Sequence, residues 1–418
     1  MSSLRWCLVS LCVVSVGLFA YPIDGYQDTG IRRLEQARLT QLGELSGTRQ
    51  PPGALLTTDQ VSIRLQGVDF ALPPGDHDFS SELTALLGEH SDNYALAILD
   101  LTDPNMPVYA EHRGQHRQNV GSVGKLVAAL GLFQGLADAY PAVVDRERVL
   151  RDTVVTADRF SHSDHHTIRL YDVETRQLTR RAMRDGDTGS LWEYLDWTLS
   201  VSSNSAAAMT MRDAMLLRQF GTDYPLPEQQ ITSYFDQHRG AQLTQLYKRT
   251  FWEPVARNGF SLDALRQGSF FTREGKHLVD GGGLSYATAR SLMQYLLAME
   301  QGRLVDPWTS IALKRLLYVT ERRIRYASAP ALASAAVYFK SGSLYSCEPE
   351  EGFKCGAYRG NVRNYMNSVA IIEEDVGGKQ LHYLVTLVSN VLRENSALAH
   401  QQLGGEIHAL IKARHGMN

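Results

Sequence analysis

The sequence predicts an α+β domain in which both ends of the chain supply strands to one antiparallel sheet, with an all-helical half inserted between them. Apolar runs typical of strands lie near residues 94–112 and return after residue 335. Between about residues 122 and 320 the apolar residues recur mostly at helical spacing, with polar loops between the helices. Strands at both ends of a helical middle indicate a sheet that the two halves of the chain close together.

Residues 1–20 differ in composition from the rest of the chain and predict a signal peptide. Arg5 is their one charged residue, and residues 7–20 are an unbroken run of apolar and small side chains. This run is too short to cross a bilayer comfortably as a helix, so we expect a periplasmic or secreted protein without a stable membrane span. An uncleaved anchor is the alternative, because Leu18 is a poor residue three positions before a cut after Ala20.

Residues 21–78 are expected to form a lead-in segment that contains several prolines and no catalytic motif. The main domain is expected over residues 79–418, with insertions near 155–190 and 215–285. The patterns predict a hairpin over residues 94–101 and 108–112, a helix from Ser122, a helix over 287–302, strands over 337–343, 365–372 and 381–388, and a final helix over 396–415.

The composition is that of an ordinary globular chain, with 44% hydrophobic and 21% charged residues. A net charge of −3, without a long Lys/Arg run, argues against a nucleic-acid binder. Beyond the signal peptide, Cys347 and Cys355 remain, and in an oxidising compartment we expect them to form a disulfide that closes one loop. Two free thiols or half of a metal site are the alternatives, although two cysteines without a second pair make a poor zinc site.

Ser122-Val123-Gly124-Lys125 is the first motif that points to chemistry, because it lies where an extended segment enters a helix. Residues three apart share a helix face, so the Lys125 amine can reach the Ser122 hydroxyl. A serine hydroxyl needs a base to become a nucleophile, and a neutral lysine can be that base. The free N–H groups at the helix start suit a developing oxyanion. A capping serine followed by a solvated lysine is the bland alternative.

Ser202-Ser203-Asn204 precedes an alanine-rich segment and is the second motif. A hydroxyl and an amide two residues apart can both point into a cleft, the first relaying a proton and the second holding a substrate amide. Ser202 could also serve as the N-cap of the following helix. A similar Ser91-Asp92-Asn93 precedes the first strand and is interpreted as unrelated to the site.

Lys340-Ser341-Gly342-Ser343 lies on an apolar strand and is the third motif. Lys340 supplies positive charge for an anionic substrate, and the hydroxyls of Ser341 and Ser343 can bind a carboxylate. Gly342 permits close approach of a substrate to the strand. The backbone N–H of Ser343 could complete an oxyanion hole with that of Ser122.

The three motifs in this order resemble the serine β-lactamase and penicillin-binding protein superfamily, closest to the class A β-lactamases, over residues 93–415. The resemblance implies a β-lactamase-like fold and an acyl-enzyme on Ser122, with Lys125 accepting its proton. It implies that Ser202 protonates the leaving nitrogen and that Asn204 holds the substrate amide. Lys340 and Ser341 would bind the substrate carboxylate, with no metal and no cofactor.

Class A enzymes also carry a glutamate that activates the deacylating water, and Trp252-Glu253-Pro254 is similar to the start of the loop that holds it. The following Val255-Ala256-Arg257-Asn258 departs from the family's pattern, which puts this role for Glu253 in doubt. The spacing between the motifs is also wider than is usual in the family.

A cluster of His162, Asp164, His165 and His166 fits no metal-ligand spacing and is interpreted as a solvated polar loop. The sequence has no G-x-S-x-G motif, which disfavours an α/β-hydrolase.

The leading hypothesis is a monomeric β-lactamase-like hydrolase acting on a β-lactam. The first alternative is a D-alanyl-D-alanine carboxypeptidase, or a related peptidase, that acts on peptidoglycan stem peptides and binds penicillin. A non-enzymatic sensor of β-lactams or muropeptides is the alternative from another class. A glutaminase with the same nucleophile motif is a smaller possibility.

Overall fold

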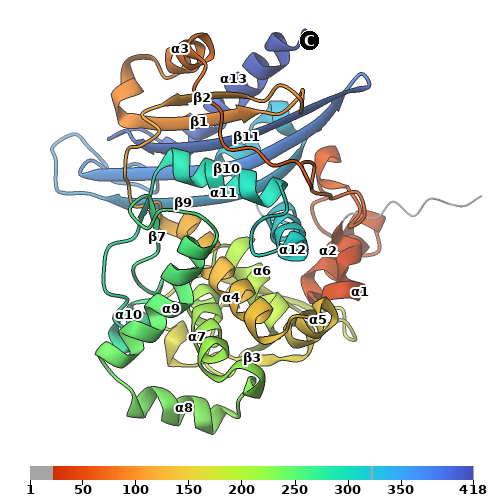
Figure 1. The fold of residues 1–418 in the computed structure, drawn as a ribbon, viewed down its shortest axis with the longest axis vertical. Helices are drawn as coiled ribbons and strands as arrows, with labels where there is room; N and C mark the ends of the chain where they lie inside the picture. Colours follow the sequence, from red (N-terminus) through yellow and green to blue (C-terminus); the bar gives the residue numbers. More distant parts are fainter. Residues whose placement is uncertain (1–21, 322, 418) are drawn as a thin grey trace, which may run out of the picture.

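The computed structural model describes residues 22–321 and 323–417, so the predicted signal peptide lies outside the described residues. One antiparallel sheet of five strands, in the order β2-β1-β11-β10-β9, forms one end of the molecule (Figure 1). Both ends of the chain contribute to it, because β1 pairs with β11 from Tyr94↔Ser389 to Asp100↔Tyr383. The strands are β1 (Tyr94–Asp100), β2 (Val108–His112), β9 (Ala336–Ser346), β10 (Arg363–Val376) and β11 (Lys379–Asn390). The predicted α+β class is therefore confirmed, with each of the five strands close to its predicted position.

Helices cover both faces of this sheet (Figure 1). The helices α3 (His77–Leu86) and α13 (Ser396–Arg414) pack on the outer face, where Phe79, Leu83 and Ile407 are completely buried. The helices α11 (Ala289–Glu300) and α12 (Pro307–Tyr318) lie against the inner face and contact β11 and β9 respectively. The burial of side chains on both faces accounts for the apolar stretches at the centres of these strands, residues 369–372 of β10 and 383–388 of β11, the latter interrupted only by Thr386.

The helical half lies beyond the inner face, and α4 and α7 are in contact at its centre (Figure 1). The prediction of a mostly helical middle is confirmed, although three short two-stranded sheets interrupt it. Its helices are α4 (Lys125–Ala139), α5 (Val143–Asp152), α6 (Leu191–Leu199), α7 (Asn204–Phe220), α8 (Glu228–Gln237), α9 (Ala241–Arg257) and α10 (Arg273–Leu278). Its strands pair as β3 (Val154–Thr156) with β6 (Thr188–Ser190), β4 (Thr167–Tyr171) with β5 (Leu178–Ala182), and β7 (Leu265–Arg266) with β8 (Tyr286–Ala287).

The lead-in segment packs on the same core as the main domain. It contains the short helices α1 (Tyr26–Thr29) and α2 (Arg32–Leu42), and the α2 residue Arg33 forms a buried ion pair with Asp196 of α6. Val61 and Leu65 are also buried in the main apolar cluster. The lead-in therefore joins the core that α4 and α7 share.

A buried charge network links the lead-in to the sheet. The ammonium group of Lys314 lies 2.5 Å from Glu300 and 2.6 Å from Glu373, and Arg64 of the lead-in binds Glu373 at 3.0 Å. Burial is the largest single effect on Glu373 and opposes its ionisation, but Lys314, His382 and Arg64 together outweigh burial and lower the pKa of Glu373. Each charge in this network has a partner of opposite sign, as buried charges require.

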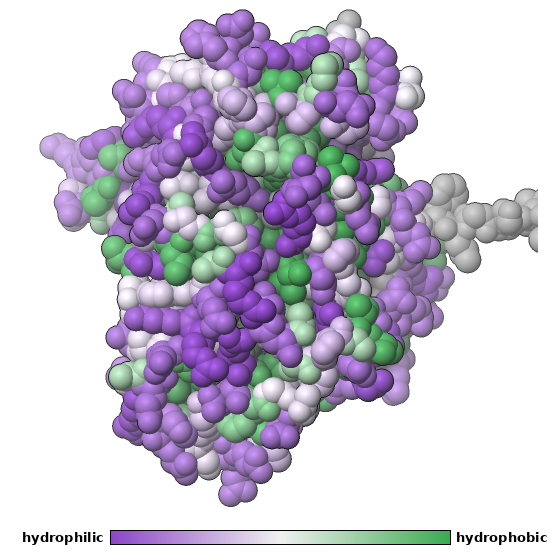
Figure 2. Space-filling model, in the orientation of Figure 1, coloured by the Kyte–Doolittle hydropathy of each residue, from purple (hydrophilic) through white to green (hydrophobic). Residues whose placement is uncertain are grey.

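No helix in the described ranges is long and apolar enough to cross a membrane. On the face drawn in Figure 2, hydrophilic side chains predominate and the apolar residues form separate patches.

Candidate active site

Ser122 lies in a 3₁₀ turn, Gly121–Gly124, that leads directly into α4. Lys125 is the first residue of α4, and its Nζ lies 3.1 Å from Ser122 Oγ. The following turns of α4 are fixed by Leu126, Val127 and Leu130, which are buried in the central apolar cluster. The packing of α4 thus holds the serine and the lysine in contact at the boundary between the sheet and the helical half.

The Lys125 ammonium is completely buried and held by three groups besides Ser122. It donates to Ser202 O at 2.6 Å and to Asn204 Oδ1 at 2.8 Å, and it lies 3.3 Å from Ser202 Oγ. Phe271 also covers it, with the ring centroid 5.0 Å from Nζ. Burial lowers the pKa of Lys125 to about 7, against the opposing effect of the Asp164 carboxylate. A substantial fraction of Lys125 is therefore neutral near pH 7 and able to accept a proton.

Ser202 connects Lys125 to the third motif. Its backbone has a φ of 63°, an unusual left-handed conformation for a serine. Its Oγ accepts a hydrogen bond from Lys340 Nζ at 2.8 Å. The N-cap of α7 is Ser203, whose Oγ accepts from Ala206 N, so the alternative in which Ser202 caps this helix is wrong. Ser202 is free of the capping role and places its hydroxyl between two amines.

The third motif lies on β9, an edge strand of the sheet. Burial lowers the pKa of Lys340 well below its usual value, and the charges of Lys125 and Arg325 act in the same direction. A Cβ atom on Gly342 would lie only 2.6 Å from Ser122 N. Gly342 therefore allows the strand to pack directly against the nucleophile turn, a closer contact than the substrate approach expected from the sequence.

Arg325 is a site residue that the sequence did not indicate. Its guanidinium group donates to Ser341 Oγ at 2.8 Å and to Ser343 Oγ at 3.0 Å. It also lies over the Tyr358 ring, 4.6 Å from the centroid. Arg325 has a φ of 55° and lies in a segment with no recognisable motif. Arg325 thus fixes the two hydroxyls that were expected to bind a carboxylate.

We expect Arg325→Leu to raise KM for a carboxylate-bearing substrate by roughly 10- to 100-fold, the value of one hydrogen bond to a charged group. The acylation rate at saturating substrate should change much less, because Arg325 lies apart from Ser122 Oγ in the hydrogen-bond network. Stopped-flow acylation over a range of substrate concentrations measures both quantities. Arg393→Leu, which removes an exposed arginine paired with Glu350, is the control. An unchanged KM in Arg325→Leu would contradict a role for Arg325 in binding the substrate carboxylate.

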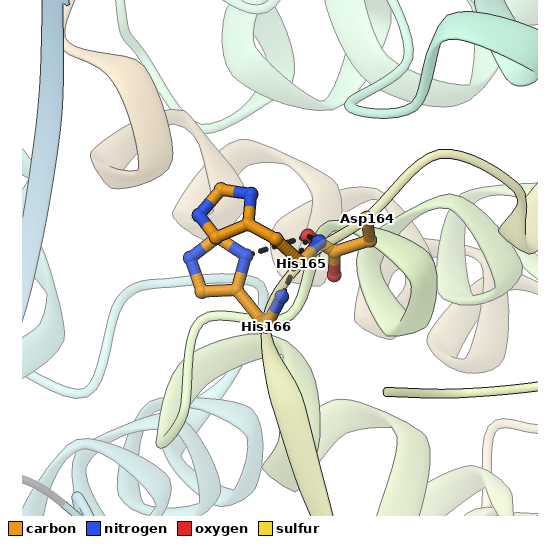
Figure 3. A group of neighbouring side chains, drawn as sticks. All are labelled: Asp164, His165 and His166. Atoms are coloured by element: carbon orange, nitrogen blue, oxygen red, sulfur yellow. Dashed lines mark hydrogen bonds and ion pairs between the residues drawn. The ribbon is translucent and has the colours of Figure 1, made fainter. Parts of the chain in front are cut away.

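The His162–His166 segment is more ordered than the solvated loop expected from its sequence. The Asp164 side chain is only 2% exposed, and one of its oxygens accepts from Asn204 N at 2.7 Å and Ser205 N at 3.0 Å. The other oxygen accepts from His166 Nδ1 at 2.6 Å (Figure 3). The expectation is corrected because Asp164 satisfies the free N–H groups at the start of α7.

Two groups in the described ranges bring three possible metal ligands together. In the group of Asp164, His165 and His166, both carboxylate oxygens already accept hydrogen bonds from the protein. In the group of Glu300, Glu373 and His382, the ammonium of Lys314 already neutralises the carboxylates. These contacts fit an ordered hydrogen-bond network and a buried ion-pair network, so we assign no metal to either group.

Glu253 does not lie with the other candidate residues. It sits within α9, is 42% exposed on its side chain, and forms an ion pair with Arg218 at 2.6 Å. Trp252 and Glu253 belong to a continuous helix here, and Trp252 donates to Gln267 O at 2.9 Å. The helical context explains why the match to the family's loop ended at Pro254, and it removes the geometric basis for Glu253 as the deacylating base.

Apart from Lys125 and the two cysteines, the remaining candidates line a cavity of about 770 Å³. Ser122, Ser202, Asn204 and the third motif all line it, together with His165, His166, Lys276 and Arg325. Among the described residues of its wall there is no Asp or Glu. The cavity thus combines a serine hydroxyl with several cationic or basic groups and lacks a carboxylate.

The expected disulfide between Cys347 and Cys355 is present, with an S–S distance of 2.06 Å. It closes the loop that follows β9, whose flanking residues Tyr345 and Tyr358 line the cavity. The disulfide therefore lies in a loop whose two ends form part of the cavity wall.

No family model and no curated protein matches the chain. Among solved structures, the TLA-3 extended-spectrum β-lactamase gives a TM-score of 0.51 at 12% identity, covering 81% of this chain and 99% of its own. A β-lactamase from Sphaerobacter thermophilus gives 0.49 at 14% identity, covering 79% and 96%. PBP-A gives 0.48 at 12% identity, covering 82% and 100%. The likeness to TLA-3 shows that the chain has a β-lactamase-like fold, as its motifs predicted.

Proposed function

We propose that the protein is a secreted serine hydrolase that forms an acyl-enzyme on Ser122. The observation that carries this proposal is the contact of 3.1 Å between Ser122 Oγ and Lys125 Nζ. The lysine is completely buried, and burial lowers its pKa to about 7. A neutral amine in contact with a serine hydroxyl is the arrangement that a general base needs.

In the proposed reaction, Ser122 Oγ attacks the carbonyl carbon of an amide while its proton passes to Lys125 Nζ. The oxyanion is stabilised by the N–H groups of Ser122 and Ser343, which the packing of Gly342 on the nucleophile turn brings near one another. The proton then passes through Ser202 Oγ, 3.3 Å from Lys125 Nζ, to the leaving nitrogen. Collapse of the intermediate breaks the C–N bond and leaves an ester on Ser122.

The charge of the cavity supports an anionic substrate. Lys340, Ser341, Ser343 and Arg325 form one connected cluster at the edge of β9. A bound carboxylate would favour the charged form of Lys340, which burial alone disfavours. Asn204 Oδ1 already accepts from Lys125, so its amide N–H groups are the part that can donate to a substrate carbonyl. A β-lactam carries both the amide and the carboxylate.

A penicillin-binding peptidase that acts on peptidoglycan stem peptides is the second candidate. The observation that favours it is the lack of Asp or Glu among the described residues of the cavity wall. Without a carboxylate to activate water, the ester on Ser122 would be released slowly. If the ester were not released at all, the protein would stay acylated and act as a sensor.

Time-resolved intact mass after mixing with benzylpenicillin, with substrate loss followed in parallel, tests the proposal. A transient adduct with rapid substrate loss supports a β-lactamase, and a long-lived adduct supports the peptidase or the sensor. Ser122→Ala should give neither adduct nor turnover. An adduct or turnover that persisted in Ser122→Ala would refute the acyl-enzyme on Ser122.

A further inference from the structure

His166 lines the same cavity as Ser122, and its ring is hydrogen-bonded to Asp164, a buried carboxylate that does not itself line the cavity. We propose that His166 is the general base that activates water to release the acyl group from Ser122, with Asp164 as its positioning residue. The inference rests on the proposed acyl-enzyme and adds the group that hydrolyses it. It assigns a role to a part of the cavity wall that acylation does not use.

The ring of His166 is held in one orientation. Its Nδ1 lies 2.6 Å from Asp164 Oδ1, and Asp164 is itself fixed by the N-terminus of α7 and by Ser203 Oγ at 2.9 Å. Figure 3 shows the second ring nitrogen of His166 pointing away from Asp164. A carboxylate that accepts from Nδ1–H leaves Nε2 without a proton in the neutral ring. The free lone pair of Nε2 is therefore the one available to a water molecule.

Asn204 joins this pair to the acylation centre. Its backbone N–H donates to Asp164, and its side-chain Oδ1 accepts from Lys125 Nζ, which contacts Ser122. The ring of His166 is 25% exposed on its side chain, so it is accessible from the cavity. A single residue of α7 thus separates the histidine–aspartate pair from the lysine that activates Ser122.

The charges around His166 support a neutral ring. Burial lowers the pKa of His166 below its usual value, and the charges of Lys125 and His165 add to that effect. The carboxylate of Asp164 acts in the opposite direction but does not outweigh them. No Asp or Glu is found among the described residues of the cavity wall, so a carboxylate base is lacking there. His166 can take that part because its lowered pKa favours the neutral ring, whose Nε2 lone pair is free.

The proposed step balances without any further reactant. Water attacks the carbonyl carbon of the Ser122 ester while one of its protons passes to His166 Nε2. The tetrahedral intermediate collapses by breaking the bond between the carbonyl carbon and Ser122 Oγ. The serine oxygen takes the proton held by the imidazolium, directly or by relay through Lys125, so that His166 and Lys125 both end neutral, and the acid product leaves.

The test compares His166→Ala with the matched control His162→Ala. His162 forms a similar pair with Asp185 at 2.7 Å in the same segment, but it does not line the cavity. With benzylpenicillin, we expect His166→Ala to acylate at a rate near that of the wild type and to release the acyl group about 100-fold more slowly. Added imidazole should partly restore release in His166→Ala. His162→Ala should release as the wild type does.

The pH dependence of release gives a second readout that a merely structural role would not move. In the wild type the release rate should fall as the pH drops through the lowered pKa of His166, because the protonated ring cannot accept a proton. Lys125, His165 and Asp164 also face the ring, and Lys125 titrates at higher pH. His166→Ala should lose the low-pH limb and keep the rest of the profile.

The outcomes separate this inference from the proposed function. If the wild type forms no adduct and no product, the acyl-enzyme itself is wrong. If Ser122 is acylated but His166→Ala releases the acyl group as fast as the wild type, the acyl-enzyme stands and the role of His166 is overturned. Release that is equally slow in the wild type and in His166→Ala overturns it as well.

Discussion

Lys125→Met is expected to slow acylation of Ser122 by about 10³-fold, because it removes the proton acceptor that contacts the nucleophile. The side chain is completely buried, and methionine fills nearly the same space. Methionine cannot donate to Ser202 O and Asn204 Oδ1, so we expect a loss of about 1–3 kcal/mol in stability, less than the stability of a typical domain, and a variant that remains folded. The loss of rate would then report on chemistry.

The pH profile of wild-type acylation provides the supporting measurement for Lys125. The base must be neutral, and burial lowers the pKa of Lys125 to about 7. Acylation should therefore rise as the pH increases through about 7 and level off above it. Lys248→Met removes a lysine that lies over Trp252 and outside the cavity, and its profile should match the wild type. A Lys125→Met enzyme that acylated at the wild-type rate would contradict the role of this base.

Gly342→Ala is expected to reduce acylation by about 10²-fold, because the new methyl group would displace the nucleophile turn. Its Cβ atom would lie 2.6 Å from Ser122 N and 2.8 Å from Val123 N. Both are backbone atoms, so the clash can be relieved only by a shift of the nucleophile turn or of β9. The expected defect lies in positioning Ser122, so it should appear in the acylation rate rather than in KM alone.

Gly356→Ala is the matched control for this prediction. A Cβ atom at Gly356 meets nothing within 4 Å, and this glycine also lies near the cavity, one residue after Cys355. Stopped-flow acylation, together with thermal unfolding, distinguishes a local displacement from a loss of fold. Equal acylation rates in the two alanine variants would show that the contact between β9 and the nucleophile turn is not needed.

The sequence predicted the sheet well because its strands are long and apolar. The apolar pattern predicts strands over residues 94–101 and 381–388. These two strands pair with each other although they lie far apart in the sequence. The lead-in had no readable pattern, since Arg33 and Arg64 are held by partners that lie far away in the sequence. Contacts of this kind carry no local signal.

The candidate site was predicted unevenly for the same reason. Ser122 and Lys125 are three residues apart on one turn, so their contact follows from local geometry. Asp164 and Arg325 acquire their places only through tertiary contacts with α7 and β9. For Glu253 the sequence suggested a role that the fold does not support. The short match of Trp252-Glu253-Pro254 to the family's loop predicted a loop, but these residues lie in the helix α9.

Peptide mapping after reaction with benzylpenicillin tests the central claim most directly. Trypsin cleaves after Arg117 and Lys125, and Ser122 is the one hydroxyl-bearing residue of the resulting peptide 118–125. If the enzyme is quenched in acid at the peak of the adduct, the penicilloyl group should be found on this peptide. A penicilloyl group on another peptide, with peptide 118–125 recovered unmodified, would contradict the account.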